Sequence, residues 1–399
     1  MIRLRNCSLL IVAGSLLLGA CDSSRNPGTP ALAADGVRHY PVFAAGGEVT
    51  DAKGAVNIYA ATGANALAPA AAKAQPLVYV PNSRSASVTV IDPTTYRVLR
   101  TLPTGALPQH VVPAYDLTRL WVLNNQASTL TPIDPVTGTE GSQIHVDDPY
   151  NMYFTPDGRF AIVVAERRER LDFRDPVTMK LVQSIHTDCR GIDHMEFTAD
   201  GRYVVATCEF SGHLLKLDIS TRKQVGFLVL DSTGRHASMP QDVRSSPDGS
   251  VFFVADMKAG GVHVIDPVSF KLMGFIPTGK GTHGIYPSRD GRLLYVTNRG
   301  WNTLRAGRRG PGSISVLDPV SRSVVATWPI PGGGSPDMGN VTADGKELWV
   351  SGRYDDEVYV FDTETGQLAH RIPVGREPHG LCVWPQPGRY SLGHTGSMR

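Results

Sequence analysis

The sequence has 399 residues, with 39 Lys and Arg against 37 Asp and Glu, and its formal net charge at pH 7 is +2. Proteins that bind nucleic acid usually present a strong positive field to the phosphate backbone, and a nearly neutral chain lacks one. Composition therefore argues against nucleic acid as the principal partner.

The N-terminus predicts export. Arg3 and Arg5 precede an apolar stretch from Leu9 to Leu18, which is too short to span a bilayer permanently and is typical of a signal peptide. The segment Leu-Gly-Ala-Cys that ends at Cys21 resembles a bacterial lipobox. That resemblance implies cleavage before Cys21 and lipidation of its side chain, which would anchor the protein to a bacterial membrane, on the periplasmic face or the cell surface. An ordinary secretory signal with a chance cysteine is the alternative.

Composition divides the rest of the chain into segments. The residues after Cys21 are rich in Ser, Pro, Gly and Ala, which is typical of a flexible tether. Val56 to Ala60 could form a strand, but Ala60 to Ala74 is low in β-forming residues and could lie along a face of the main domain. We expect a signal peptide at residues 1–20, a tether at 21–36, an N-terminal extension of uncertain structure at 37–76, one repeat domain at 77–388 and a C-terminal tail at 389–399.

A turn signal recurs seven times in the repeat domain. Each copy is an Asp-Gly turn, or a degenerate version of one, with a short apolar run on either side, and its positions are Asp116, Asp157, Asp200, Asp248, Asp290, Asp344 and Gln386. A second set of anchors ends the next apolar run of each copy, at Asp92, Asp134, Asp175, Asp218, Asp266, Asp318 and Asp362. A period of about 40 to 45 residues with four short strands is the sequence signature of a propeller blade.

One copy of the repeat carries a family motif. Residues 295–298 read Tyr-Val-Thr-Asn, and other copies carry variants such as Phe-Val-Ala-Asp at residues 253–256. The chain resembles, over residues 77–388, the YVTN (YncE-like) family of β-propeller repeats. The resemblance implies an all-β, seven-bladed propeller with four-stranded antiparallel blades. A DNA-binding member of that family keeps nucleic acid from being dismissed entirely.

The two ends of the repeat domain predict how the ring closes. The first strands, Leu77 to Val80 and Ser87 to Ile91, have no turn signal before them, while His379 to Trp384 has no strands after it. Each end holds what the other lacks. We therefore expect His379 to Trp384 to be the inner strand of the blade formed by residues 77–103, which would remove the exposed edges of an open sheet.

Three cysteines remain once Cys7 is removed and Cys21 is acylated. If the turn at Asp200 sets an antiparallel register, Cys208 lies opposite Ile192, near Cys189, and a disulfide is the favoured reading in an oxidising compartment. The alternative groups Cys189, Cys208, His194 and Met195 as soft ligands for copper. Cys382 is left unpaired.

The positions seven and six residues before each turn signal are mostly polar. Both fall where an inner strand begins, so they should ring one mouth of the central channel. The candidate ligand-binding residues among them are His110, Asp193, His194, Asp242, His283, Asp337 and His379. Such a rim could bind a small ligand or a metal, or it could only satisfy backbone groups of neighbouring blades.

Two long insertions fall in loops on the same side as this rim. One spans Asp231 to Met239, and the other spans Arg299 to Gly312. Long loops on a rigid scaffold often carry binding residues. The second loop combines an aromatic ring with cations that would suit an anionic or aromatic partner, namely Trp301, Arg305, Arg308 and Arg309.

Motifs of catalysis are missing from the sequence: there is no G-x-S-x-G, H-E-x-x-H, phosphate-binding Gly-Lys motif or C-x-x-C-H. We interpret the protein as a membrane-anchored extracytoplasmic propeller that acts as a binding or scaffold module for a protein or small-molecule ligand. The alternative is a periplasmic redox or cofactor-handling enzyme whose His/Asp rim holds a divalent metal or a haem-type cofactor. The propeller class resembles the haem d1 domain of nitrite reductases, but a shared fold does not assign chemistry.

Overall fold

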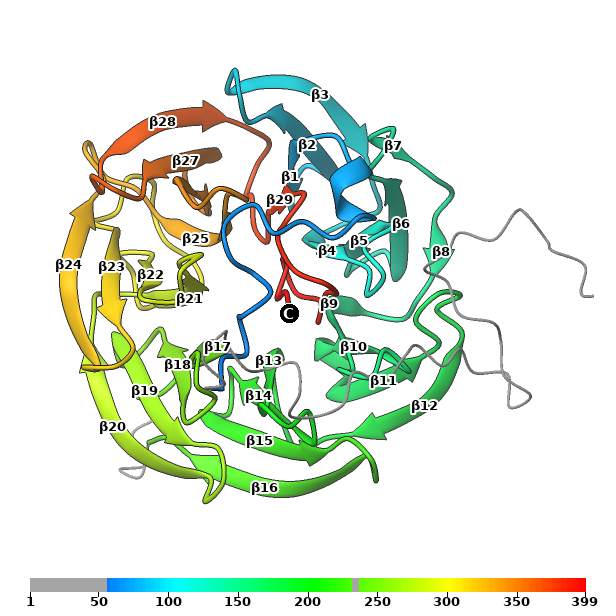
Figure 1. The fold of residues 1–399 in the computed structure, drawn as a ribbon, viewed down its shortest axis with the longest axis vertical. Helices are drawn as coiled ribbons and strands as arrows, with labels where there is room; N and C mark the ends of the chain where they lie inside the picture. Colours follow the sequence, from blue (N-terminus) through cyan, green and yellow to red (C-terminus); the bar gives the residue numbers. More distant parts are fainter. Residues whose placement is uncertain (1–55, 232–236) are drawn as a thin grey trace, which may run out of the picture.

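The computed structural model describes residues 56–231 and 237–399, which form a ring of seven sheets (Figure 1). The all-β, seven-bladed propeller predicted from the sequence is therefore confirmed. The predicted signal peptide, Cys21 and the tether lie outside the described residues.

Each blade is an antiparallel meander, and in every blade but the closing one its first strand in the chain lies nearest the axis. In chain order the strands are β1 (Leu77–Asn82), β2 (Ser87–Asp92), β3 (Arg97–Pro103), β4 (Pro108–Pro113), β5 (Leu120–Asn124), β6 (Thr129–Asp134), β7 (Thr139–Glu140), β8 (Ile144–His145), β9 (Pro149–Phe154), β10 (Ala161–Ala165), β11 (Arg170–Arg174), β12 (Leu181–His186), β13 (Ile192–Phe197), β14 (Tyr203–Cys208), β15 (His213–Asp218), β16 (Lys223–Val229), β17 (Pro240–Ser245), β18 (Phe252–Asp256), β19 (Gly261–Asp266), β20 (Lys271–Pro277), β21 (Thr282–Pro287), β22 (Leu294–Asn298), β23 (Ser313–Asp318), β24 (Ser323–Pro329), β25 (Pro336–Val341), β26 (Glu347–Gly352), β27 (Glu357–Asp362), β28 (Leu368–Pro373) and β29 (Cys382–Trp384). Two 3₁₀ turns, η1 (Ala71–Lys73) and η2 (Glu166–Arg168), complete the elements.

Asp side chains form the two recurring turns. Between β9 and β10, Asp157 Oδ1 accepts hydrogen bonds from the Thr155 hydroxyl at 2.6 Å and from the Arg159 N–H at 3.1 Å, and Gly158 has φ +67°. Glycine adopts that left-handed conformation without steric cost. Between β19 and β20, Asp266 Oδ1 accepts the N–H groups of Val268 and Ser269. These local bonds explain why both Asp series mark the repeat.

One blade departs from the four-strand pattern. Its outermost strand is split into β7 and β8, which pair with opposite ends of β6. Pro132 lies in the middle of β6 and has no N–H to donate to a neighbouring strand. Its carbonyl accepts the Gly141 N–H at 2.8 Å, where the chain passes between the two short strands. The proline explains the interruption.

The apolar core lies between the blades. Phe253 and Val264 of one blade, for example, pack in a single cluster with Ile285, Leu294 and Leu317 of the next. The outermost strands are mostly exposed, as the burial pattern of β16 shows. Each blade is therefore stabilised by burial against its two neighbours.

The ring closes where β29 pairs with β1 in antiparallel register, with Leu77 opposite Trp384 and Tyr79 opposite Cys382. This confirms the predicted closure. The strand is shorter than expected because its first part leaves the ladder: the His379 N–H bonds to the Pro81 carbonyl, while Gly380 bridges to His110 of the next blade.

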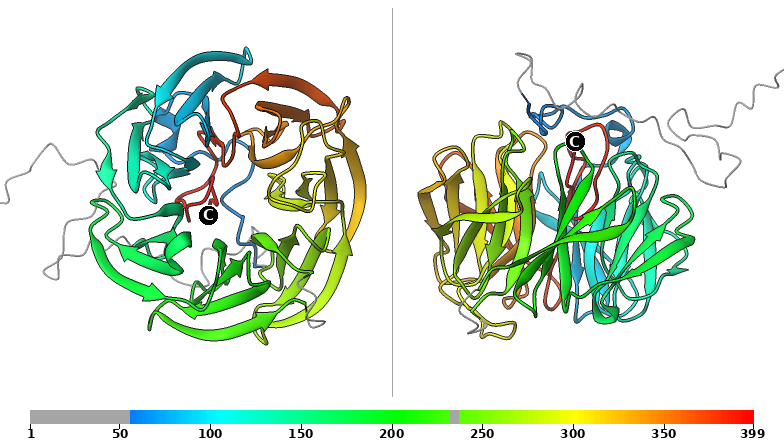
Figure 2. Two further views of the ribbon diagram at one scale, coloured as in Figure 1. Left: turned by 180° about the vertical axis from the view of Figure 1, so that it is seen from behind. Right: turned by 90° about the horizontal axis from the view of Figure 1, so that it is seen from below.

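Both ends of the described chain lie on one face of the ring (Figure 2). We call this the Asp-Gly face, because it carries the turns between the first and second strands. The segment at residues 56–75 crosses it, with the Ile58 N–H bonded to the Pro247 carbonyl at 2.8 Å and the Asn65 N–H to the Ala343 carbonyl at 2.8 Å. The C-terminal tail runs from this face into the channel, where the Leu392 carbonyl accepts the Phe154 N–H at 3.0 Å. We call the opposite face, where the inner strands begin, the strand-start face.

Among residues 56–231 and 237–399, no helix has the length and hydrophobicity needed to cross a bilayer.

We predict that the closing strand is a principal source of stability. Trp384 is 1% exposed and packs in the cluster that contains Leu77 and Tyr79. Trp384→Ala should lower the free energy of unfolding by about 3–5 kcal/mol, measured by urea denaturation, because it leaves a cavity at the seam of the ring. Val320→Ala, at a side chain that is 89% exposed, is the matched control and should change it by less than about 0.5 kcal/mol. Equal effects of the two substitutions would contradict this account of closure.

Candidate functional site

The seven residues predicted at the channel rim are brought together at the centre of the ring, and each is at most 2% exposed. The four imidazoles form a closed circuit, with ring centroids 5.6 Å apart for His110 and His194, 6.1 Å for His194 and His283, 6.0 Å for His283 and His379, and 4.8 Å for His379 and His110. The rim is therefore a buried cluster below the mouth of the channel.

Asp337 organises one half of this cluster. Its Oδ2 accepts a hydrogen bond from His379 Nδ1 at 2.6 Å, and its Oδ1 accepts one from Arg299 Nε at 2.6 Å and lies 3.2 Å from His283 Nδ1. Arg299 also donates to His283 Nε2 at 2.7 Å. The positive charge of Arg299 holds the pKa of Asp337 below its usual value despite burial. This half is held together by hydrogen bonds and ion pairs around Asp337, although His283 Nδ1 is buried without a hydrogen bond among the described residues.

The other half contains three imidazoles: His110, His194 and a histidine that the sequence did not single out, His394. Ring centroids lie 5.5 Å apart for His110 and His394 and 4.8 Å apart for His194 and His394. The Nε2 atom of each ring is buried and has no hydrogen-bond partner among the described residues. Buried polar atoms are rarely left in this state unless they serve a function or bind something further.

Two carboxyl groups flank these imidazoles. Asp242 accepts the N–H groups of Val243 and Ile285, and burial raises its pKa to about 6 although Arg244 lies beside it. Asp193 Oδ1 lies 3.2 Å from His194 Nε2, and neither of its buried oxygens accepts a hydrogen bond within the described part of the chain. Burial raises the pKa of Asp193 well above its usual value.

A second ring lies at the position just after the second strand of each blade, on the strand-start face. Its members are Ser83, Asn125, Glu166, Glu209, Met257, Arg299 and Arg353. The sequence pointed only to Arg299, as part of a long loop, because the side chains of this ring share neither charge nor polarity. The signal that could have found them is positional: each follows the last residue of a β strand at the same point of the repeat.

The acidic and basic residues of this second ring lie on different sides of it. Glu166 and Glu209 come from adjacent blades, and Arg299 and Arg353 come from another adjacent pair. Burial, followed by the charges of Glu209 and Asp148, raises the pKa of Glu166 to about 8, and burial also raises the pKa of Glu209. Glu166 and Arg353 are partly exposed, so the cluster reaches solvent at this ring.

The C-terminal tail places His394 in the channel through a tight hairpin. The Leu392 N–H bonds to the Ser397 carbonyl at 2.7 Å and the His394 N–H bonds to the Met152 carbonyl at 2.8 Å. Gly393 has φ +94°, and a Cβ atom there would lie 2.3 Å from the Met152 carbonyl oxygen, so only glycine fits. The sequence analysis assigned His394 to a C-terminal tail without a predicted structure. The only signal for its position is the segment Gly-His-Thr-Gly at residues 393–396.

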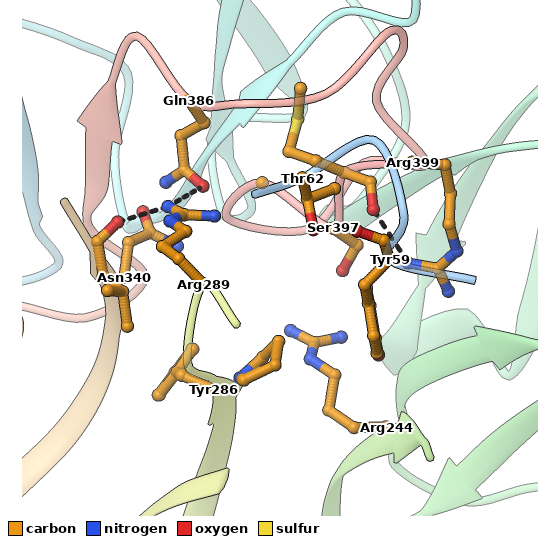
Figure 3. Close-up of a pocket in the computed structure, with 13 residues that line it drawn as sticks. Tyr59, Thr62, Arg244, Tyr286, Arg289, Asn340, Gln386, Ser397 and Arg399 are labelled. Carbon is orange, nitrogen blue, oxygen red and sulfur yellow. Dashed lines mark hydrogen bonds between the residues drawn. The ribbon is translucent and has the colours of Figure 1, made fainter. Parts of the chain in front are cut away.

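The channel end on the Asp-Gly face is filled by other side chains of the termini. A cavity of about 40 Å³ there is lined by residues that include Tyr59, Arg244, Arg289 and Arg399 (Figure 3). Arg399 donates to Glu196 at 2.8 Å and Arg289 donates to the Gln386 side chain at 3.1 Å. A space of this size holds only a few water molecules, so we regard the strand-start face as the entrance to the cluster.

The loop at residues 299–312 packs against the neighbouring blade. Arg308 donates to the Asp355 carbonyl at 2.6 Å, and Arg309 pairs with Glu357. Trp301 is 39% exposed, and Arg305 is exposed as well. These contacts tie two of the predicted recognition residues to the neighbouring blade, and a recognition role for the loop stays a prediction. The other long loop includes residues 232–236, which are outside the described ranges.

Cys189 and Cys208 are joined in a disulfide, with their Cα atoms 5.1 Å apart and Ile192 opposite Cys208 in the sheet. His213 lies close to both sulfur atoms, but disulfide sulfurs are not the thiolates that bind metals. The copper grouping of these cysteines with His194 and Met195 has no thiolate available in this state. Cys382 is buried and unpaired.

Comparisons with known proteins agree with this architecture. The chain is similar to a hydrazine synthase of Kuenenia stuttgartiensis (TM-score 0.58, 18% identity, 68% of this chain and 88% of that chain covered). It is also similar to the dihydro-heme d1 dehydrogenase NirN in complex with DHE (TM-score 0.57, 15% identity, 78% and 76%). A third similar structure is a functionally unknown protein from Desulfotomaculum acetoxidans DSM 771 (TM-score 0.62, 15% identity, 78% and 100%).

At these identities the structural similarities establish the fold alone. No curated protein matches the sequence. The model of the YNCE-like beta-propeller family matches residues 48–387. Because the match covers nearly all of the ring and most of the sequence, the chain belongs to the YncE-like β-propeller family.

Proposed function

We propose that this propeller is an extracytoplasmic binding protein that holds a small polar ligand at the channel mouth on its strand-start face. The observation that carries the proposal is a set of buried polar atoms without partners in a channel that the termini fill from the other side. Arg353 Nη1 and both Asp193 oxygens belong to this set. A ligand that satisfied these atoms would recover the cost of their burial.

The charges at the mouth favour a ligand with two poles. Arg299 is neutralised by Asp337, whereas Arg353 Nη1 is buried and has no hydrogen-bond partner among the described residues. Across the ring, Glu166, Glu209 and Asp193 are three carboxyl groups of raised pKa. A carboxylate placed at Arg353 would meet its complement. Glu166, whose pKa of about 8 keeps it mostly protonated at neutral pH, would ionise beside a ligand ammonium group, because a nearby positive charge favours the carboxylate. An amino-acid-like zwitterion therefore fits best.

Binding of free amino acids tests this proposal. In calorimetric titration, an L-amino acid panel should include ligands that bind more tightly than the matching carboxylic acids or amines, which carry only one of the two charges. Arg353→Met should weaken that binding about tenfold to a hundredfold, because it removes a charge-assisted hydrogen bond. Arg97→Met, on the exposed strand β3, is the matched control and should have no effect. Absence of binding across the panel, or equal loss in both variants, would sink the proposal.

The raised pKa of Glu166 predicts a pH dependence of stability. Its pKa is about 8 in the folded protein and about 4.3 in an unfolded chain. Between these values the folded state binds more protons, so the contribution of Glu166 to stability is full at low pH and is lost as pH rises through 8. Glu166→Gln carries no titrating carboxyl. The melting temperature of the variant relative to wild type should therefore rise between pH 5 and pH 9, and parallel curves would contradict the burial of this carboxyl.

We also propose that the protein is lipid-anchored outside the cytoplasm. The lipobox-like residues 18–21 and the preceding apolar stretch support this, and the Cys189–Cys208 disulfide is the kind of bond that persists in oxidising compartments. Residues 1–55 lie outside the described ranges, so the proposal rests on sequence for its anchor.

Cys21→Ala should move the protein from the membrane fraction to the soluble extracytoplasmic fraction, because the substitution removes the lipid acceptor. Cell fractionation followed by immunoblotting measures the change, with Cys382→Ala as a control that keeps the anchor. Persistent membrane association of the Cys21 variant would overturn the lipid anchor and leave the binding proposal untouched.

A further inference from the structure

We propose that His110, His194 and His394 form a binding site for one divalent transition-metal ion, with Zn²⁺ or Cu²⁺ as the occupant. One ring nitrogen from each residue lies within 4.8 Å of those of the other two, and all three side chains are fully buried. The Nε2 atom of each ring lacks a partner in the described structure. Imidazole nitrogens are ligands that zinc and copper prefer, whereas calcium and magnesium prefer oxygen.

The second contact of His110 fixes it in the ligand form. Its Nδ1 lies 2.9 Å from the Tyr150 carbonyl oxygen, which can only accept. Nδ1 therefore carries the proton, and the lone pair of the buried Nε2 atom is free for a ligand. Metal-bound histidines usually make such a bond through the other ring nitrogen.

Asn151 serves the other two histidines together. Its side-chain amide lies 3.1 Å from His194 Nδ1 and 2.9 Å from His394 Nδ1. With the amide nitrogen facing them, both Nδ1 atoms accept and both Nε2 atoms carry protons. This orientation is the one in the structure, since Asn151 Oδ1 accepts the Met152 N–H at 2.9 Å. Metal binding would require the amide to turn over at the cost of that backbone bond, so that its oxygen accepts both Nδ1–H groups and frees both Nε2 lone pairs. Asn151 is thus a positioning residue whose orientation couples the two ligands.

The hairpin that carries His394 is built to hold this ring in the channel. His394 has φ +54°, a left-handed conformation that is uncommon for side chains other than glycine, and Gly393 and Gly396 flank it with positive φ. The tail has no equivalent in the repeat, so the imidazole that it places beside His110 and His194 comes from outside the blades.

Bond lengths predict a movement on binding. Zinc–nitrogen bonds of about 2.0–2.1 Å place tetrahedral ligand nitrogens roughly 3.3 Å apart, which is closer than the 4.8 Å limit that holds the three nitrogens. The metal would draw the rings inward and fasten the tail to the channel. Asp193, 3.2 Å from His194 Nε2, is placed to supply a fourth ligand. The imidazole spacing leaves room for an ion but not for a haem-type macrocycle between the rings.

Equilibrium dialysis of the chelator-treated full chain against Zn²⁺ tests the proposal. One ion should bind per chain, and His110→Ala, His194→Ala and His394→Ala should each weaken binding at least a hundredfold. His145→Ala, at an imidazole whose side chain is 75% exposed, is the control for surface histidines and should leave the stoichiometry and affinity unchanged. Wild-type binding that is absent, or that survives in the three channel variants, would overturn the site.

A second measurement separates a metal site from a merely structural cluster. Zn²⁺ should slow carboxypeptidase digestion of the tail in the wild type but not in His110→Ala, whose tail is otherwise intact. Asn151→Asp should keep or strengthen Zn²⁺ affinity, since a carboxylate accepts both Nδ1–H groups, whereas Asn151→Leu should weaken it at equal helical and sheet content by circular dichroism. Equal affinity of the two Asn151 variants would refute the positioning role.

This inference goes beyond the proposed binding of a zwitterion and can fail separately from it. The dialysis contains no amino acid, and the amino-acid titrations can be run on chelator-treated protein. Loss of metal binding with retained amino-acid binding would reject only the metal site, and the reverse outcome would reject only the small-molecule ligand.

Discussion

The pairing of β29 with β1 is the contact on which the rest of the molecule depends. Every other blade is one continuous meander, so the ring has a single seam, and Trp384 meets Leu77 there. The segment that leads into β29 also brings His379 to Asp337, and the segment that follows it brings His394 into the channel. Closure and construction of the site are therefore one event, because the same stretch of chain performs both.

The centre of a seven-bladed ring concentrates polar groups in a space with little water, and charges there are costly unless they are paired. The chain resolves this problem on one side only. Asp337 joins Arg299, His283 and His379 in a network in which the charges are paired. On the other side, Asp193 and three imidazole nitrogens remain without partners among the described residues. The backbone of the ring is thus nearly symmetric, whereas the polar side chains at its centre are not. A ligand gains the most hydrogen bonds in the half where buried polar atoms lack partners.

The sequence predicted what is local and repeated. Asp157 and Asp266 form hydrogen bonds within their own turns, so the repeat and the number of blades could be predicted from them. The residues of the channel rim could be predicted as well, because they lie at a fixed distance in sequence from the Asp-Gly turns. The second ring could not be predicted from the sequence, because Ser83, Met257 and Arg353 have only their position in the repeat in common. His394 could not be predicted, because its tail has no counterpart in the repeat. The position of Arg309 depends on its contact with Glu357, a tertiary contact that sequence spacing does not encode. The split between β7 and β8 was not predicted although Pro132 stands in the sequence. The effect of a proline depends on which neighbouring strand would have accepted its missing N–H, and the sequence does not show that.

The seam also has a consequence for biosynthesis. A ribosome delivers β1 long before β29, and contacts between such distant segments form late because the intervening loop must first be ordered. A nascent chain that carries most of the blades still presents the open inner edge of β1, which β29 has yet to cover and which is a template for association with other chains. Translocation in an unfolded state would postpone this hazard until the last strand is present. The imidazole of His394 follows β29 by ten residues, so the assembled triad of histidines can exist only in a chain that has been translated beyond its closing strand.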